Sequence, residues 1–244
     1  MAVLRLDKLI SSSGTASRKE VRSLVRSGRV TVNGVPAGSA DMKVDAECDD
    51  VRLDGERIVF EEHRYIMMNK PAGYVSSTDD PRDATVLELL PEEYRRFSLF
   101  PAGRLDKDAE GLLILTDDGD YCHNVISPKK NVYKKYYVRV ENALDESDKA
   151  AFERGITLSD GTAFLPGKLE LLSGNECYVY IREGKYHQVK RMLGYLGKPV
   201  IYLKRLSVGG LELDPEIECG EIKKLSREEA ELVFSDGCKG NCVK

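Results

Sequence analysis

The sequence predicts an α+β protein, in which a small N-terminal α/β part precedes a larger part built on a mixed, mainly antiparallel sheet. Three observations support this fold class. Strand-like and helix-like segments occur without the regular strand–helix alternation that produces parallel sheets. The dipeptides Asn33-Gly34 and Asp54-Gly55 are typical of tight hairpins between antiparallel strands. The length of 244 residues leaves room for two folded parts.

The first part, residues 1–60, is expected to combine two short helices with hairpin strands. Its second helix starts at the capping box Ser17-Arg-Lys-Glu20, in which two side chains satisfy free backbone amides, and Gly28 is a natural stop. In order, we expect a helix over 4–11, a break at 12–14, a helix from the capping box to Gly28, a strand over 30–32, a turn at 33–34 and a returning strand from residue 35.

The second part, residues 64–234, follows a polar bridge at 61–63 and mixes both element types. Two further capping boxes, Thr85-Val-Leu-Glu88 and Ser226-Arg-Glu-Glu229, mark helix starts. We expect strands over 65–68, 112–116, 136–140, 178–181 and 200–203, and helices near 85–90, 119–126, 145–154, 186–196 and 226–234. Residues 235–244 are expected to form a flexible tail.

The composition is that of an ordinary globular chain, with 41% hydrophobic residues, 32% charged residues and a formal net charge of −4. Any case for nucleic-acid binding must therefore rest on local clusters of basic residues. No apolar run is long enough for a membrane span, and the N-terminus lacks the layout of a signal peptide. We expect a cytoplasmic monomer without membrane association.

The six cysteines are scattered, which favours reduced thiols over a disulfide framework in a chain of this length. Cys238 and Cys242 have a spacing that could hold a metal or form a bridge. A metal site would need a second Cys or His pair nearby, and the sequence offers none. The interpretation is an inert tail, and no metal is predicted.

Basic side chains concentrate in the first 35 residues, where seven Lys and Arg face only two acids. Arg18, Arg22 and Arg26 lie four residues apart, so they share one helical face. Such a row suits phosphate contacts, although a solvated basic face has the same pattern. Two more basic segments, residues 184–205 with six cations and no acid and the run Lys129, Lys130, Lys134 and Lys135, would complete three patches for an RNA backbone.

The densest group of reactive side chains is Gly103-Arg-Leu-Asp-Lys-Asp-Ala-Glu110, directly before an apolar strand. This position places Asp106 on a loop at the edge of a sheet, where catalytic groups are common. An ionised Asp can act as a nucleophile or a base when a nearby cation holds its charge. On residue types alone, however, an acidic turn before a strand is more often structural.

The order of helices, capping box and hairpin over residues 3–50 resembles the alpha-L RNA-binding domain. The matching segments are Arg5-Leu-Asp-Lys-Leu-Ile10, Ser17-Arg-Lys-Glu20 and Val30-Thr-Val-Asn-Gly34. In that family the two helices and the hairpin grip structured RNA through its backbone. The resemblance implies RNA contacts by Arg5, Lys8, Arg18, Lys19, Arg22 and Arg26.

Four segments of the second part resemble, in the expected order, the motifs of the RsuA-type pseudouridine synthases. They are Asn69-Lys-Pro-Ala-Gly73, Gly103-Arg-Leu-Asp106 with Glu110-Gly-Leu-Leu-Ile-Leu-Thr-Asp-Asp-Gly119, Lys134-Lys-Tyr-Tyr-Val138 and Glu183-Gly-Lys-Tyr-His-Gln-Val-Lys-Arg-Met192. Together with the N-terminal part, the likeness spans nearly the whole chain. Long motifs in the correct order are more specific than any single one.

This resemblance implies that Asp106 is the catalytic carboxylate that isomerises a uridine to pseudouridine, with no metal or organic cofactor. Attack at the base and attack at the anomeric carbon both remain open. Tyr136 matches the base-stacking tyrosine and Lys190 the cation that pairs with the Asp. The implied substrate-binding set is completed by Arg104, Lys190, Arg191 and His187, with Arg104 also expected in a salt bridge inside its domain. The remaining acids, Asp108, Asp117 and Asp118, are interpreted as loop and turn acids.

Within the family, the run Tyr186-His-Gln-Val-Lys190 and the segment Arg205-Leu-Ser-Val-Gly-Gly210 look closest to the small-subunit branch. The expected partner is therefore ribosomal RNA, specifically 16S rRNA in a pre-ribosomal particle. The same chemistry on 23S rRNA is one alternative, and a non-catalytic rRNA-binding or ribosome-assembly protein is another. An RNA methyltransferase is disfavoured, because no Gly-rich cofactor loop follows a strand.

Overall fold

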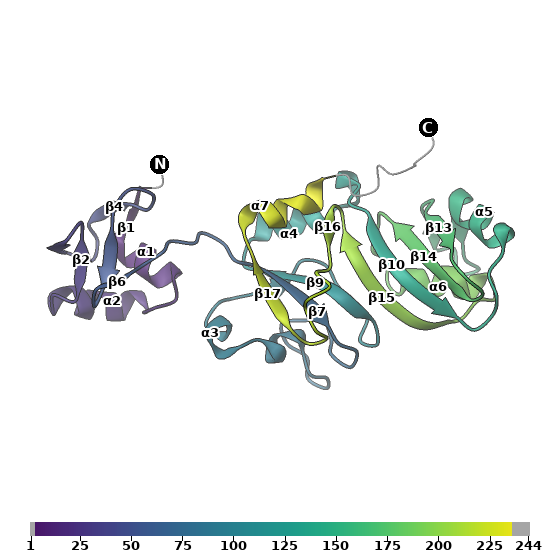
Figure 1. Ribbon diagram of the computed structural model, residues 1–244, viewed down its shortest axis with the longest axis horizontal. Helices are drawn as coiled ribbons and strands as arrows, with labels where there is room; N and C mark the ends of the chain where they lie inside the picture. Colours follow the sequence, from purple (N-terminus) through teal and green to yellow (C-terminus); the bar gives the residue numbers. More distant parts are fainter. Residues whose placement is uncertain (1–2, 236–244) are drawn as a thin grey trace. The chain divides into compact units, whose positions relative to one another are not determined.

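The computed structural model describes residues 3–235. The chain divides into two compact units, with the boundary in the sequence between His63 and Arg64. Figure 1 shows the elements of both units. The expected tail, except for Ser235, lies outside the described residues, and so do Cys238 and Cys242. None of the described helices is long and apolar enough to cross a membrane.

The first unit contains two helices, a four-stranded antiparallel sheet in the order β3-β2-β5-β6, and the separate strand pair β1-β4. Its elements are β1 (Val3–Arg5), α1 (Leu6–Ser12), α2 (Arg18–Arg26), β2 (Val30–Val32), β3 (Val35–Pro36), β4 (Lys43–Asp45), β5 (Val51–Leu53) and β6 (Glu56–Arg57). One apolar core joins both helices to the strands, and Leu6, Ile10, Val21 and Val30 within it are completely buried.

Local signals of the first unit are mostly confirmed. The strand over 30–32 and the capping box are present: the Glu20 amide donates to Ser17 Oγ at 3.3 Å, and the Ser17 amide donates to the Glu20 carboxylate at 2.7 Å. Asn33 and Gly34 have φ of 53° and 79°, as a two-residue hairpin turn requires. The helix expected over 4–11 begins only at Leu6, because the preceding residues pair with β4.

The second unit is built on a nine-stranded sheet with the order β13-β14-β10-β15-β9-β7-β17, to which β16 and β8 add at β15 and β9. All pairs in it are antiparallel except the parallel pair β9–β15, which confirms the mainly antiparallel mixed sheet. Its strands are β7 (Tyr65–Lys70), β8 (Phe100–Pro101), β9 (Glu110–Thr116), β10 (Lys134–Val140), β13 (Lys168–Leu171), β14 (Glu176–Ile181), β15 (Val200–Val208), β16 (Leu211–Glu212) and β17 (Ile222–Leu225), with β11 (Ile156–Thr157) and β12 (Ala163–Phe164) forming a separate pair.

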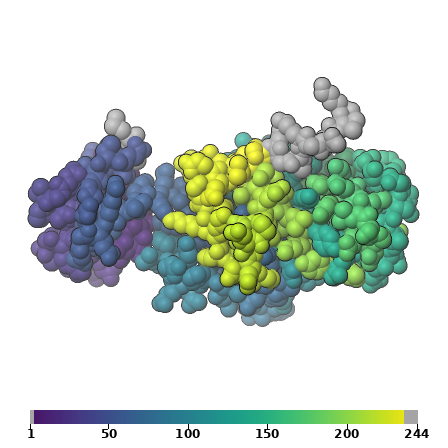
Figure 2. Space-filling view, viewed as in Figure 1, coloured from purple at the N-terminus to yellow at the C-terminus, as the bar shows by residue number. Residues whose placement is uncertain are grey.

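Of the two capping boxes recognised in the second unit, Ser226 starts an α-helix and Thr85 starts a 3-10 turn. The helices are α3 (Glu92–Arg95), α4 (Gly119–Ile126), α5 (Glu146–Arg154), α6 (Gln188–Tyr195) and α7 (Arg227–Glu231), with 3-10 turns at Val86–Leu89, Pro128–Lys130 and Leu232–Phe234. The helix expected near 85–90 is therefore only a short 3-10 turn. In Figure 2 the C-terminal segment with β17 and α7, in yellow, lies on the surface of this unit.

The sheet is covered on two faces near β7 and β9 and on one face near β10 and β14. Alternate residues of β9 enter different cores, with Leu113 and Leu115 in one and Leu112 and Ile114 in the other. The larger core also takes in Tyr136 from β10 and the inner face of α6. The start of β9, the middle of β10 and the start of α6 thus converge on one side of the sheet.

We expect Gly111→Ala to destabilise the protein by at least about 3 kcal/mol. Gly111 has φ of +99°, and a Cβ there would lie 2.2 Å from the carbonyl oxygen of Arg205, its partner in the β9–β15 pair. Gly194→Ala is the matched control, because that position in α6 has open space. Urea unfolding should show the control unchanged or more stable by about 0.5–1 kcal/mol, and equal losses in both variants would contradict the prediction.

Candidate active site

Asp106 lies in the loop between β8 and β9, and hydrogen bonds fix the backbone of this loop. The hydroxyl of Ser76, which is buried, accepts from the Leu105 amide at 3.1 Å and donates to the Leu105 carbonyl at 3.0 Å. The Gly73 amide donates to the Lys107 carbonyl at 2.7 Å. The segment after β7 therefore holds the residues on both sides of Asp106.

Lys70, at the end of β7, is a completely buried cation beneath the same loop. Its ammonium group donates to the carbonyls of Pro71 at 2.9 Å, Lys107 at 3.3 Å and Ala109 at 2.8 Å. Burial lowers the pKa of Lys70 to about 8, against the attraction of the Asp108 and Asp106 carboxylates. Two carbonyls of the Asp106 loop and one of the segment after β7 are thus tied to a single side chain, which restricts how far the loop can move.

Arg205, on β15, anchors the other end of the loop from within the core. Its Nε donates to the Leu112 carbonyl at 2.8 Å, and its Nη1 donates to the Arg104 carbonyl at 3.3 Å. The side chain is only 3% exposed, and its Nη2 is buried without a hydrogen-bond partner among the described residues. Arg205 therefore brings an incompletely satisfied cation close to the backbone that carries Asp106.

The Asp106 carboxylate is paired with the Lys190 ammonium at 3.1 Å from the first turn of α6. Lys190 also forms an ion pair with Asp108. Burial alone would lower the pKa of Lys190, but the two carboxylates outweigh it, so this pKa lies above its ordinary value. Lys190 is therefore a permanent cation at neutral pH and favours the ionised form of its partner.

His187 is a more distant neighbour of the carboxylate, with 3.7 Å between its Nε2 and Asp106 Oδ1. This separation is longer than a hydrogen bond, so the imidazole does not share a proton directly with Asp106. The ring is 39% exposed and stands at the outer side of the ion pair. His187 therefore lies at the rim of the site rather than inside it.

Tyr136 and Asp106 line the same small pocket. Tyr136 is 7% exposed and packs in the larger core. Its position on the pocket wall also leaves it available to a planar base. The other lining residues are Arg104, Leu105, Ile181, Gly184, Lys185, Gln188, Val189 and Leu203.

Lys134 lies two residues before Tyr136 on the same buried side of β10. Burial, with the repulsion of Arg205, lowers the pKa of Lys134 to about 8. Lys134 and Arg205 give the protein interior behind Tyr136 a positive potential. Such a potential attracts both a carboxylate and the phosphates of an entering nucleotide.

Arg191 and Arg104, both expected to bind substrate, have contacts that differ from those expected. Arg191 donates to Asp160 at 2.5 Å and to Thr162 at 3.2 Å, so its guanidinium group is engaged by the β11–β12 turn instead of the Asp106 pocket. The salt bridge expected for Arg104 is not formed within residues 3–235; this side chain is exposed, on the wall of the pocket. The Arg104 backbone is held instead by Arg205, which donates to the Arg104 carbonyl.

Asp108, Asp117 and Asp118 lie in loops and turns, as expected. Asp117 pairs with Arg64 at 2.6 Å, and Asp118 caps α4 by accepting from the Tyr121 amide at 2.9 Å. Asp108 is 74% exposed and contacts only the outer side of Lys190 among the ion pairs of residues 3–235. These carboxylates do not form a second acid–base pair with Asp106.

Residues 184–205 form a less basic surface than their sequence suggests. Most of the six cations have internal partners: Lys185 pairs with Glu183, Lys190 with Asp106 and Asp108, Arg191 with Asp160 and Lys198 with Asp148, while Arg205 is buried. The expectation of an open basic patch here was wrong. Sequence counts charges but cannot show which of them point inward or meet an acid.

In the first unit, five of the six proposed RNA contacts are exposed and form no ion pair with the described residues: Lys8, Arg18, Lys19, Arg22 and Arg26. Arg5 differs, because its guanidinium group binds the Asp7 carboxylate through two hydrogen bonds, at 3.0 and 2.7 Å. Asp7 is 2% exposed, and the Arg5 hydrogen bond lowers the pKa of Asp7 despite burial. Arg5 is thus a surface cation that also stabilises the fold by pairing with a buried carboxylate.

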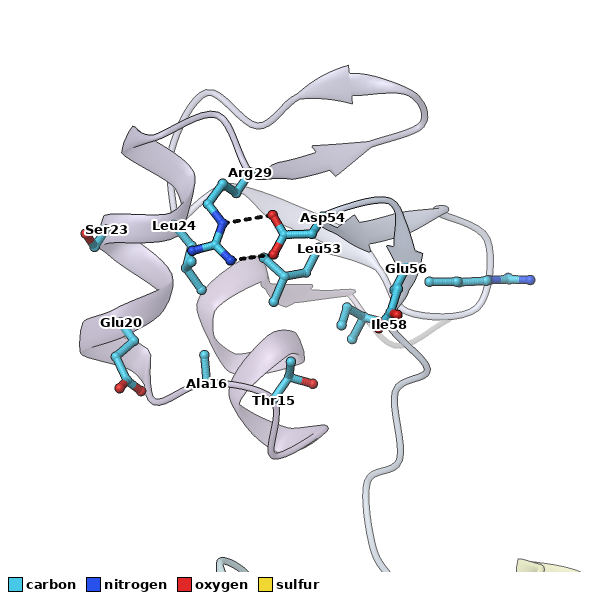
Figure 3. A pocket seen from close by; sticks show the side chains of 11 residues that line it. Thr15, Ala16, Glu20, Ser23, Leu24, Arg29, Leu53, Asp54, Glu56 and Ile58 are labelled. Atoms are coloured by element: carbon cyan, nitrogen blue, oxygen red, sulfur yellow. Dashed lines mark hydrogen bonds and ion pairs between the residues drawn. The ribbon is translucent and has the colours of Figure 1, made fainter. Parts of the chain in front are cut away.

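A more spacious groove of about 750 Å³ lies between α2 and the β5–β6 hairpin (Figure 3). The ion pair of Arg29 with Asp54 crosses one wall, and the other charged lining residues are Glu20, Glu56 and Arg57. Its three carboxylates exceed its two guanidinium groups, so it does not attract phosphate. It also contains none of the residues of the four pseudouridine-synthase motifs, and its size alone gives it no catalytic role.

The sequence assigns no role to Lys70 and predicts Lys134 and Arg205 in surface patches for RNA, whereas all three side chains are buried. The only signal for Lys70 is its position at the end of the apolar run Tyr65-Ile-Met-Met-Asn-Lys70, where a buried strand would carry it inward. Lys134 lies two residues before Tyr136 and Arg205 two residues after Leu203, so each shares a strand face with an apolar residue, which predicts an inward side chain. For Lys134 and Arg205 the charge suggested a surface position, but the two-residue alternation of side chains along a strand indicates the buried position correctly.

Comparison with known proteins gives matches in both units. Residues 64–195 match the RNA pseudouridylate synthase family, and residues 4–51 match the S4 domain. An uncharacterized RNA pseudouridine synthase of Bacillus subtilis is 45% identical over 94% of this chain and 98% of its own. Ribosomal small subunit pseudouridine synthase A is 41% identical in Vibrio cholerae, over 95% and 100% of the two chains, and 39% identical in Escherichia coli, over 93% and 98%.

A solved structure supports the same assignment. The crystal structure of a pseudouridylate synthase superposes on this chain with a TM-score of 0.67 and 36% sequence identity. The match covers 94% of this chain and 99% of that one. The likeness therefore extends over both units.

We expect Lys134→Met to be more stable than the wild type at pH 7, by roughly 1–3 kcal/mol. The pKa of Lys134 is about 8 when folded and 10.5 in its ordinary state. Between these values the unfolded chain binds more protons, so the stability contributed by Lys134 rises with pH. The advantage of the variant should therefore shrink as pH rises from 8 to 10.

The measurement is the free energy of unfolding in urea at pH 7, 8, 9 and 10. Lys129→Met, which removes an exposed lysine, controls for the general effect of losing one charge. A difference between Lys134→Met and wild type that stays constant across this range would contradict the prediction.

Proposed function

The chain belongs to the RNA pseudouridylate synthase family, and we propose that it converts one uridine of small-subunit (16S) ribosomal RNA to pseudouridine through the carboxylate of Asp106. Membership of the family makes it an isomerase that acts on RNA. The observation that carries the assignment of Asp106 is its ion pair with Lys190 at 3.1 Å on the wall shared with Tyr136. An ionised carboxylate beside a stacking surface is the arrangement that the reaction needs.

The reaction starts with extrusion of the uridine from its RNA stack, since the target atoms are inaccessible inside a helix. Tyr136 offers a planar surface for the uracil ring, and stacking on an aromatic ring stabilises a base by ~1–3 kcal/mol. The carboxylate of Asp106 then acts as the nucleophile, either on the base or on the anomeric carbon of the ribose. Lys190 holds the carboxylate in its charged form before the attack and again after Asp106 is released.

The rearrangement conserves all atoms of the nucleotide. The bond between N1 of uracil and the anomeric carbon breaks, the ring turns within the pocket, and carbon 5 forms the new bond to the ribose. The hydrogen on carbon 5 leaves as a proton, N1 gains one, and Asp106 is released unchanged. Apolar walls from Leu105, Ile181, Val189 and Leu203 exclude water while the base is detached.

The proposed substrate class follows from the named relatives and the first unit. Two relatives at about 40% identity over nearly the whole chain are ribosomal small-subunit enzymes. The S4 domain presents five exposed cations for an RNA backbone. We therefore infer a cytoplasmic monomer that binds 16S rRNA in a pre-ribosomal particle, with 23S rRNA as the competing substrate.

The assignment of Asp106 is tested by mapping pseudouridine in both large ribosomal RNAs of cells that lack the protein. One site of 16S rRNA should lose its pseudouridine, and wild type should restore it whereas Asp106→Asn should not. Asp108→Asn removes a neighbouring exposed carboxylate and should lower turnover by less than about tenfold. A lost site in 23S rRNA would change the substrate, and unchanged modification in all strains would favour a non-catalytic RNA-binding protein.

The division of labour between the units predicts how the Arg22→Gln/Arg26→Gln double variant behaves. Removing two exposed cations should raise KM for the rRNA substrate and leave kcat unchanged, because neither residue is in the unit that contains Asp106. A plot of log affinity against log salt should become shallower by about 1.5 to 2 units. Arg154→Gln, which removes an exposed arginine of the second unit, is the control, and identical salt slopes for the double variant and wild type would argue against RNA backbone contacts by this row.

A further inference from the structure

Tyr186 is a large aromatic residue that the proposed mechanism does not use. It lies in the loop before α6 and is 70% exposed. Its ring stacks on the ring of His187, with 3.8 Å between centroids and 16° between planes. One face of the tyrosine is thus covered by the imidazole, and no other ring contact is formed by it within residues 3–235.

The stack depends on an unusual backbone conformation. Side chains of consecutive residues point apart in a strand and do not face each other in a helix, so neighbours rarely stack in parallel. His187 has φ of 48° and ψ of 34°, in the left-handed region that residues other than glycine seldom adopt. Strained backbone of this kind persists where the surroundings enforce it, and it is common at functional sites.

The surroundings of His187 enforce the conformation through a buried clasp between Glu183 and Gln188. Gln188 Nε2 donates to the Glu183 carboxylate at 3.0 Å, and Gln188 Oε1 accepts from the Lys185 amide at 3.1 Å. Glu183 also accepts from the Leu165 amide at 2.8 Å. Glu183 and Gln188 are 5% and 4% exposed, so the ends of the loop are fixed while Tyr186 is held out in solvent.

Hydrophobic burial does not explain this arrangement. A tyrosine that is 70% exposed gains little from leaving water, and an isolated exposed aromatic residue has no need of a strained neighbour. The loop instead produces a flat ring with one free face. His187, on which this ring stacks, lies at the rim of the active site, with its Nε2 3.7 Å from Asp106. The Tyr186 ring is therefore separated from the rim only by the His187 ring.

We propose that the free face of Tyr186 binds the nucleobase adjacent to the target uridine in the RNA chain. This inference rests on the proposed function, because extrusion of the uridine removes a stacking partner from each neighbouring base. The target base itself enters the pocket of Tyr136, which Tyr186 does not line. Tyr186 is therefore a substrate-binding residue. Its ring replaces the stacking partner that one adjacent base loses, and this contact fixes the register of the RNA.

The test compares Tyr186→Ala and Tyr186→Phe with wild type on an rRNA stem–loop that contains the uridine mapped in the deletion strain. Two further stem–loops carry an abasic nucleotide on the 5′ or the 3′ side of that uridine. Loss of the ring should reduce kcat/KM about 5- to 150-fold, mainly through KM, while Tyr186→Phe keeps wild-type activity. The difference between Tyr186→Ala and wild type should disappear on one of the two abasic substrates.

A binding measurement gives an independent result. With 2-aminopurine at the neighbouring position, wild type and Tyr186→Phe should quench its fluorescence and Tyr186→Ala should not. Tyr195→Ala is the matched control, because Tyr195 is 58% exposed and lies at the far end of α6. Equal melting temperatures of all variants would show that the folds are intact.

Different failures lead to different conclusions. Wild-type activity of Tyr186→Ala on the intact stem–loop, or a loss of equal size on all three substrates, would overturn the role of Tyr186 and leave the proposed function standing. A wild-type protein that modifies no uridine of ribosomal RNA would overturn both. Loss of activity in Tyr186→Phe as well would show that the hydroxyl group, and not stacking, is what the substrate needs.

Discussion

The second unit depends on the attachment of one polar turn to two buried cations. Lys70 binds carbonyls on the C-terminal side of Asp106, and Arg205 binds carbonyls on both sides, at Arg104 and Leu112. A buried ammonium or guanidinium group is costly without partners, and backbone carbonyls supply them. The same bonds satisfy the turn, which has no partners in regular secondary structure. Charge burial and loop geometry therefore stabilise each other.

The topology of the sheet makes this attachment possible. Arg205 reaches the loop because β15 runs parallel to β9, the only parallel neighbours in the sheet of the described residues, and the two backbones approach closely at Gly111. The antiparallel pair β10–β15 then sets Tyr136 opposite Arg205. A reactive loop, a stacking ring and a positive interior thus meet because of strand order. Lys190 is positioned by a different element, the first turn of α6.

Sequence predicted the parts of the structure that depend on local physics. Capping boxes at Ser17 and Ser226 and the turn at Asn33-Gly34 were found because their hydrogen bonds and dihedral angles involve a few consecutive residues. Strands β13 and β17 were missed, since Ile222-Lys-Lys-Leu225 carries the charges of an edge strand and does not alternate. Motif resemblance brought Asp106, Tyr136 and Lys190 together correctly. It could not show that Arg191 turns to Asp160, because that contact depends on a loop 31 residues away.

The fate of the basic residues explains how an acidic protein can use cations for two purposes. In the second unit Lys70 and Arg205 are buried and hydrogen-bonded to the loop, and Lys190 is paired with Asp106. Interactions among such charges are only weakly screened by salt. In the first unit the row on α2 is exposed and unpaired within the described residues, so its field extends into solvent. Attraction of the RNA should accordingly depend on ionic strength, whereas the chemical step, governed by buried charges, should be nearly insensitive to it.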